Sequence, residues 1–200
     1  MKNIIFNQKI KLFKYTTIRV GGSAEYFAEP NNMHEFINLI KWSHLNKKEC
    51  RIIGAGSNLL INNTLIRGLT ICTKKLKDIN IEPVTGLIKA DAGVMLPTIS
   101  NLLARNGLQG GEWTVGIPGT LGGAICMNAG TGKLSIANYL LSVQVINTKT
   151  LEISKIEKKD IDFKYRFSPF QQNNLVIISA TLRFQPKGNV KQLLETTKNN

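Results

Sequence analysis

The first third of the chain alternates short, mostly apolar stretches with one longer amphipathic segment. Residues 26–28, 51–53 and 69–72 each end at turn-forming or polar residues, which is typical of strands. Residues 32–46 repeat their apolar positions with a period near 3.6, which predicts a helix. The order strand, helix, strand, turn, strand indicates a small α/β unit with parallel pairing. The turn at Gly54 then follows a strand, and ligands of open α/β sheets bind at such ends.

The remaining pattern favours an antiparallel sheet with one helix. We expect a helix over residues 96–105, because Pro97 stands in its first turn and Asn106–Gly107 follows its last. The hairpin signal at residues 147–150 predicts antiparallel pairing of the strands that flank it. We expect strands at residues 87–90, 143–147, 151–156 and 175–184.

Composition fits a soluble globular chain, and the net charge fits one that binds an anionic partner or ligand. The formal net charge is +13, from 26 basic and 13 acidic residues. Such an excess suits nucleic acid, an anionic membrane or an anionic small ligand. The charge is spread evenly, without a basic tail or an aromatic-basic motif, so we expect no nucleic-acid partner. No apolar run approaches a membrane span, and the N-terminus lacks a signal-peptide core, so we expect no membrane insertion and a cytoplasmic location.

Cysteine and histidine spacing gives no chemical site. Cys50, Cys72 and Cys126 are far apart and odd in number, so we expect neither a disulfide framework nor a zinc site. His34 and His44 have no carboxylate cluster nearby and fit a solvated helix surface. No metal site is predicted.

Glycines concentrate in one stretch of the second half. Nine of the 17 glycines lie in residues 107–132, most densely in residues 116–130. Clustered glycines let the backbone approach a ligand and aim consecutive N–H groups at an anion. A tight connector packed against a sheet explains the spacing equally well, so spacing alone leaves both interpretations open.

A second glycine loop, residues 54–58, follows the strand at residues 51–53. It fails the dinucleotide fingerprint, because Leu59 stands at the third glycine position and an apolar, strand-like stretch rather than a helix follows. Gly132–Lys133 likewise fails the Walker pattern. The amides of residues 54–58, with Ser57 and Asn58 as extra donors, still fit a phosphate. Two such loops in one chain suggest a diphosphate between them.

The segment Tyr165-Arg166-Phe167-Ser168 is the third candidate feature. It fits an exposed turn, and it also fits a fixed cation. Arginine stays charged at every working pH, and its planar fork of donors can stabilise a developing oxyanion.

Taken together, these segments resemble the UDP-N-acetylenolpyruvoylglucosamine reductase family of flavoenzymes. The matching pieces are residues 16–22 (TTIRVGG), 54–59 (GAGSNL), 116–130 (GIPGTLGGAICMNAG) and 165–168 (YRFS), in that order. The resemblance covers nearly the whole chain.

The resemblance implies an α+β, two-lobed FAD-binding domain of the vanillyl-alcohol-oxidase (PCMH) type. It combines a small α/β lobe, here residues 1–75, with a larger antiparallel α+β lobe, here residues 76–188. FAD is the implied cofactor, NADPH the co-substrate and a UDP-sugar the substrate. The implied reaction reduces UDP-N-acetylglucosamine enolpyruvate to UDP-N-acetylmuramate for peptidoglycan precursor synthesis.

Carried over by position, the resemblance implies two sets of site residues. Arg166 steadies the enolate-like intermediate, with Tyr165 beside it. The residues implied to bind FAD are Arg19, Gly21, Gly22, Gly54, Ala55, Gly56, Ser57, Asn58, Leu59, Gly116, Ile117, Pro118, Gly119, Thr120, Gly122, Gly123, Asn128 and Gly130.

One part of the family pattern has no match here. The family's serine proton donor, in a Ser-x-Gly-Ser-x-Phe context, and a late glutamate lie in a third domain, and no such string occurs. We therefore expect residues 189–200 to begin a linker to a C-terminal substrate domain that this chain lacks. The alternative function is a flavin-binding module or truncated remnant without full turnover, since general-acid catalysis is worth about 10²–10⁴-fold.

Overall fold

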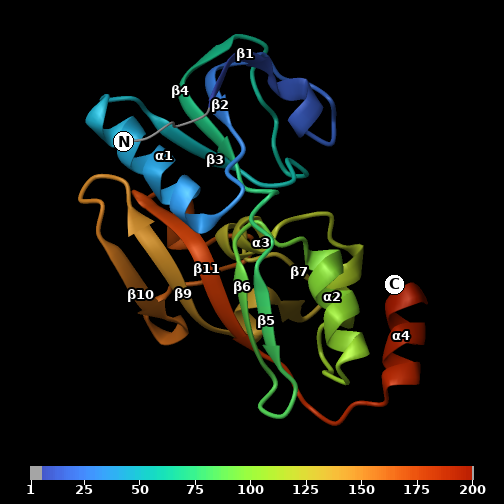
Figure 1. Cartoon of the computed structure of the whole chain (residues 1–200). Coiled ribbons are helices and arrows are strands. Elements are labelled where there is room, and N and C mark those ends of the chain that lie inside the picture. The colour runs from blue at the N-terminus through green and yellow to red at the C-terminus, as the bar shows by residue number, and fades with distance from the viewer. Residues whose placement is uncertain (1–5, 200) are drawn as a thin grey trace.

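The computed structural model describes residues 6–199. Residues 1–5 of the expected first lobe and residue 200 of the expected linker lie outside it. Figure 1 shows two sheets, with helix α1 near their junction and helices α2 and α4 side by side. The first part contains β1 (Asn7–Lys11), η1 (Leu12–Tyr15), β2 (Ser23–Ala28), α1 (Met33–Leu45), β3 (Cys50–Ile53) and β4 (Leu65–Cys72). The second contains β5 (Ile79–Glu82), β6 (Leu87–Asp91), α2 (Leu96–Arg105), η2 (Glu112–Gly116), α3 (Leu121–Cys126), β7 (Gly130–Thr131), β8 (Leu134–Ser135), η3 (Ile136–Asn138), β9 (Leu140–Asn147), β10 (Ile153–Glu157), η4 (Lys158–Asp160), η5 (Pro169–Gln171), β11 (Leu175–Arg183) and α4 (Val190–Asn199).

The first sheet has the order β1-β2-β4-β3, with β4 parallel to both β2 and β3. The predicted helix and parallel pairing are therefore confirmed. Phe36 and Ile40 of α1 pack with Leu69 and Ile71 of β4, as the amphipathic period requires. Their cluster also includes Ile146 and Ile178 of the second sheet, so α1 joins the two sheets.

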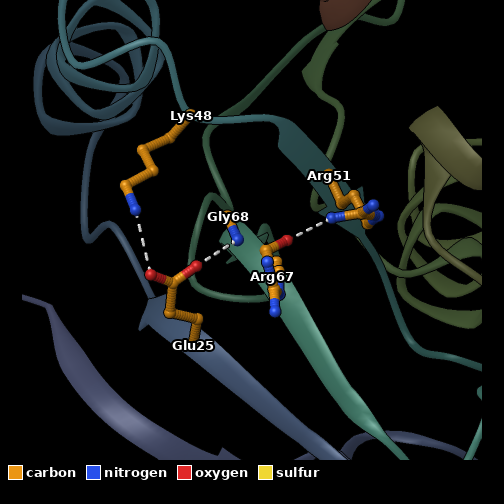
Figure 2. Close-up of polar contacts among 5 residues, drawn as sticks. All are labelled: Glu25, Lys48, Arg51, Arg67 and Gly68. Carbon is orange, nitrogen blue, oxygen red and sulfur yellow. Dashed lines mark hydrogen bonds and ion pairs between the residues drawn. The ribbon is translucent and has the colours of Figure 1, made fainter.

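A bulge interrupts the pairing of β2 with β4, and a half-exposed ion pair between Glu25 and Lys48 lies beside it. The register shifts so that Arg67 and Gly68 lie opposite Glu25 alone. The Gly68 N–H donates to the Glu25 carboxylate (2.7 Å), and the Lys48 ammonium donates to its other oxygen (2.9 Å) (Figure 2). Gly68 has φ +86°, and a Cβ there would overlap the carbonyl oxygen of Glu49, so the bulge requires glycine.

The bulge predicts a pH-dependent contribution of Glu25 to stability. The Gly68 N–H, and then Lys48, hold the pKa of this carboxyl below its ordinary value of 4.5. A pKa depressed by folding stabilises the protein above the ordinary pKa, and that stability is lost as the pH falls through the folded pKa. Glu25→Gln should therefore lower the free energy of unfolding at neutral pH, and the difference should shrink below pH 4.5.

Urea unfolding of the wild type and of Glu25→Gln measures the difference in their free energies of unfolding. The pH should run from about 7 to about 3, so that it spans the ordinary glutamate pKa. Lys48→Met, which removes only the weaker of the two named causes, should show a smaller loss with the same pH trend. A difference that stays constant over the whole range would contradict the assignment.

The second sheet has the order β10-β9-β11-β6-β5 and is antiparallel throughout its described pairs. The β9–β10 hairpin around residues 147–150 and helix α2 are confirmed as predicted. One face of this sheet packs against α2 and α3 in the largest apolar cluster, which includes Leu96, Leu121 and Val143. Within residues 6–199, no helix is long and apolar enough to cross a membrane.

Several elements differ from the sequence-based expectation. Residues 59–61 look strand-like because they are apolar, but they form a loop, and no strand in the described part of the chain pairs with them. Strand β1 was missed because its residues are polar and exposed, whereas the alternation of Ile79 and Ile81 in β5 was a usable signal. Residues 121–126, expected in a glycine loop, form helix α3, with Thr120 as its N-cap.

Residues 190–199, expected as a linker, form helix α4. Leu193 and Thr197 are buried four residues apart, which places them on one helix face. The Asn189 side chain accepts from the Gln192 N–H (3.1 Å) at the helix start. The helix packs against α2 (Figure 1), so this segment is ordered by contact with the second part of the chain.

Candidate functional site

A cleft of about 1070 Å³ lies where the two glycine-rich segments meet. Residues 54–59 line one side, and Gly116–Thr120, Gly122 and Gly123 line another. The segments are in contact: a Cβ on Gly54 would overlap Thr120 Oγ1, and one on Gly119 would lie 3.8 Å from Ser57 Oγ. The expected juxtaposition of the two loops is therefore present in the fold.

The loop at residues 54–58 keeps its donors free. Among the described residues, none of its five N–H groups and neither the Ser57 nor the Asn58 side chain makes a hydrogen bond. Gly56 has φ +68° and packs against the Tyr15 carbonyl, while its own carbonyl accepts from the Thr17 N–H (3.1 Å). The loop is thus anchored from behind, and its amides are available to a ligand.

The amides of the second loop are mostly used by the protein itself. The N–H groups of Gly119, Leu121 and Gly122 donate to Ile117, Val94 and Ala92, respectively, and that of Gly123 donates to Thr120 Oγ1. Between residues 117 and 123, the Thr120 N–H is the remaining one without an acceptor in residues 6–199. Of the two interpretations that the spacing left open, the structure favours the packed connector over a row of free amides, because α3 and the strand-like bridge to residues 92–96 consume most of the donors. The loop contributes shape rather than a row of amides.

Arg19, Gly21 and Gly22 do not line the cleft. Gly22 is buried against Thr64, and its N–H donates to the Asn62 carbonyl (2.9 Å). Arg19 is exposed. Gly21 and Gly22 instead pack against residues 61–64, and Leu60, Ile61 and Asn62 of that stretch line the cleft.

Arg166 lines the same cleft, and two backbone carbonyls hold its guanidinium. One nitrogen donates to the Gly130 carbonyl (2.7 Å) and another to the Asn128 carbonyl (3.5 Å). Its backbone is left-handed, with φ +53°. Tyr165 is 88% exposed and lies outside the cleft, with its ring centroid 5.2 Å from the Arg166 Cζ. Of the segment at residues 165–168, Arg166 is therefore the residue that brings a held cation to the cleft.

The C-terminal end of α3 is hydrogen-bonded to the segment that carries Arg166. Ser168 Oγ donates to the Cys126 carbonyl (2.7 Å), and the Gln171 amide donates to the Cys126 and Arg166 carbonyls (3.0 Å each). Asn128 is buried, and its amide nitrogen donates to the Lys164 carbonyl (2.9 Å). Gly130 lines the cleft and Asn128 stands behind it. Sequence reasoning missed Gln171, for which no local signal exists.

Two cysteines that line the cleft are not reactive thiolates. Burial raises the pKa of the Cys126 thiol, and it raises the pKa of Cys50 to about 11. Both therefore stay protonated at neutral pH and act as small apolar wall residues.

Comparison with known proteins identifies the relatives of this chain. Residues 24–153 match the family described as an FAD binding domain, so the chain carries an FAD-binding domain. UDP-N-acetylenolpyruvoylglucosamine reductase of Prochlorococcus marinus subsp. pastoris (strain CCMP1986 / NIES-2087 / MED4) is 70% identical over 200 residues, covering 100% of this chain and 68% of that protein. The protein of the same name from Prochlorococcus marinus (strain MIT 9313) is 43% identical over 191 residues, covering 96% and 62%. The chain therefore spans about two thirds of these curated relatives' length.

Solved structures agree with these matches. The crystal structure of UDP-N-acetylenolpyruvylglucosamine reductase (MurB) from Thermus caldophilus has a TM-score of 0.76 at 26% identity and covers 98% of this chain and 68% of that one. Alkyldihydroxyacetonephosphate synthase has a TM-score of 0.65 at 15% identity, covers 84% of this chain and 33% of that one, and so shares the fold. The fold is the α+β, vanillyl-alcohol-oxidase (PCMH) type expected from the resemblance. On the identity, coverage and fold together, this chain belongs to the UDP-N-acetylenolpyruvoylglucosamine reductase family.

Proposed function

We propose that this chain binds FAD and takes part in the NADPH-dependent reduction of UDP-N-acetylglucosamine enolpyruvate to UDP-N-acetylmuramate. The observation that carries the proposal is the cleft that brings both glycine-rich segments and Arg166 together. Its relatives bear the name of the enzyme for this reaction. The formal net charge of +13 also suits ligands that are all anionic.

The residues of the cleft fit FAD. The five N–H groups of residues 54–58, which have no acceptor within residues 6–199, are donors for a diphosphate, and the Thr120 N–H adds one from the other loop. Ile117 and Pro118, with Cys126, supply apolar wall. When bound, FAD would accept hydride from one substrate and donate it to the other.

Arg166 is the residue that we assign to catalysis. Its guanidinium is fixed at the cleft by two carbonyls, and its remaining N–H groups can donate to an oxygen on which negative charge develops. The Arg166 Cζ lies over the neighbouring Tyr165 ring, 5.2 Å from its centroid, which is within cation–π distance. The backbone carbonyl of Asn128 helps to hold Arg166, and Gly21 and Gly22 pack against residues 61–64. These three residues therefore support the cleft without lining it.

A flavin-binding module without full turnover is the second candidate function. It is favoured by the family model, because residues 24–153 match an FAD binding domain. We propose the division of the FAD-binding domain near residue 75, between the end of β4 at Cys72 and the start of β5 at Ile79. The cytoplasmic location stays a prediction.

Flavin binding tests the proposed function. The purified chain, unfolded to release any ligand and refolded with FAD, should carry about one FAD per chain and show flavin absorbance after gel filtration. A chain that stays colourless at micromolar FAD would contradict the proposal. Oxidation of NADPH that depends on UDP-N-acetylglucosamine enolpyruvate, measured on the same sample, separates the reductase from the flavin-binding module.

A further inference from the structure

Part of the cleft lies beyond the glycine loops, on one face of the first sheet. Arg51 of β3, and Ile66 and Thr70 of β4, line it. Leu69 and Ile71, which flank Thr70, pack with the residues of α1. Since successive side chains of a strand point to opposite faces, Thr70 points away from α1.

The hydroxyl of Thr70 is the polar group in this region that lacks a partner. Thr70 is 2% exposed, and its Oγ1 makes no hydrogen bond within residues 6–199. Arg51, its direct partner in the parallel register, already donates to the Arg67 carbonyl and the Glu49 carboxylate (Figure 2 shows the first of these contacts). A buried hydroxyl without a partner is costly, so it marks a position where a ligand group completes the site.

A neighbouring threonine provides an internal comparison. Thr73 is also 2% exposed and also lines the cleft, but its Oγ1 donates to the Ile53 carbonyl (3.3 Å). Two buried hydroxyls three residues apart therefore differ in whether the protein itself satisfies them.

We propose that Thr70 hydrogen-bonds the adenosine half of the dinucleotide. This proposal rests on the proposed function, in which the amides of residues 54–58 hold the diphosphate at the middle of the ligand. Arg166 and Gly130 line the cleft from the second part of the chain, beside the place assigned to the reacting flavin. The face of the first sheet is then left for the other end of the ligand.

The chemistry of this face suits adenosine. Leu12, Ile53 and Ile66 line the cleft together with Thr70 and offer an apolar surface to a purine ring. A threonine hydroxyl can donate to a ring nitrogen or accept from the exocyclic amine. The glycine loop begins directly after Ile53, whose register partner is Cys72, two residues along β4 from Thr70. Two strand residues span about 7 Å, which is within the reach of an adenosine joined to the diphosphate.

The test compares dissociation constants for FAD, FMN and ADP among variants of the whole chain. Thr70→Val keeps the shape and removes the hydroxyl, and Thr70→Ala is a second variant without it. Both should weaken FAD and ADP by about 3- to 10-fold and leave FMN unchanged, because FMN lacks the adenosine. Thr70→Ser should bind all three like the wild type.

Thr73→Val is the matched control. It should lower the melting temperature, because it removes a hydroxyl that is bonded to Ile53, while the ratio of FAD to FMN affinity stays as in the wild type. Ligand-free Thr70→Val should melt at or above the wild-type temperature, because it buries no unpaired hydroxyl.

Unchanged FAD affinity in both Thr70→Val and Thr70→Ala would overturn this assignment alone, and so would an equal loss for FAD and FMN. A wild-type chain that binds no FAD would overturn both this assignment and the proposed function. The two failures are therefore distinguishable from one set of titrations.

Discussion

Replacing Gly123 with valine is expected to lower the affinity for FAD by about 10- to 100-fold while the protein stays folded. Gly123 is exposed and lines the cleft, and a Cβ there would meet only Thr120 Oγ1, at 3.4 Å. The added side chain therefore extends into the space assigned to the ligand. Titration of flavin fluorescence with the refolded variant measures the loss.

The neighbouring Gly122 is the control, because a side chain added there would collide with the protein itself rather than extend toward the ligand. A Cβ on Gly122 would lie 2.8 Å from the Ala92 Cβ and 3.2 Å from the Ala92 carbonyl oxygen. Gly122→Val should therefore lower the free energy of unfolding by about 1–3 kcal/mol, the usual cost of overpacking. If Gly123→Val binds FAD like the wild type, or unfolds as readily as Gly122→Val, the assignment of this wall is wrong.

The contrast between these glycines shows why the sequence could predict where the site lies but not which of its residues contact the ligand. Both glycines look alike in the run at residues 116–130, and the family resemblance implies that both bind the ligand. Only the fold shows that Gly122 packs on Ala92, 30 positions earlier in the chain. Long-range contacts with Val94 and Ala92 consume the amides of Leu121 and Gly122, whereas the loop at residues 54–58 keeps its own because it is held through the Gly56 carbonyl, which accepts from the Thr17 N–H.

The regular elements could be predicted because their signals are local. The 3.6-residue period gave α1, and the turn residues gave α2 and the β9–β10 hairpin. Helix α3 has two glycines in six residues, so helix propensity argued against it, and burial of Leu121 and Ile125 decided the outcome. The bulge at Gly68 depends on Glu25 and Lys48, which are distant in sequence, and no local pattern announces it.

Replacing Arg166 with lysine is expected to slow the consumption of UDP-N-acetylglucosamine enolpyruvate by about 10²–10³-fold, the usual cost of losing one preorganised donor to a developing oxyanion. The affinity for FAD should not change, because none of the unpaired amides of residues 54–58 depends on Arg166. Anaerobic mixing of the reduced protein with this substrate, followed by chromatographic quantification of the product, measures the rate for each variant.

The geometry explains why lysine cannot substitute. Two nitrogens of the guanidinium are committed to the carbonyls of Asn128 and Gly130, and the planar fork still has donors left for a third oxygen. A lysine ammonium has three N–H donors on one nitrogen, so it would have to lie within hydrogen-bond distance of both carbonyls and the substrate oxygen from a single point, whereas the guanidinium spreads its donors over separate nitrogens. Tyr165→Phe is the matched control: it keeps the ring beside the guanidinium and removes a hydroxyl on a side chain that is 88% exposed, so the rate should stay close to that of the wild type. Equal losses in both variants would mean that the segment, rather than the cation, supports the reaction.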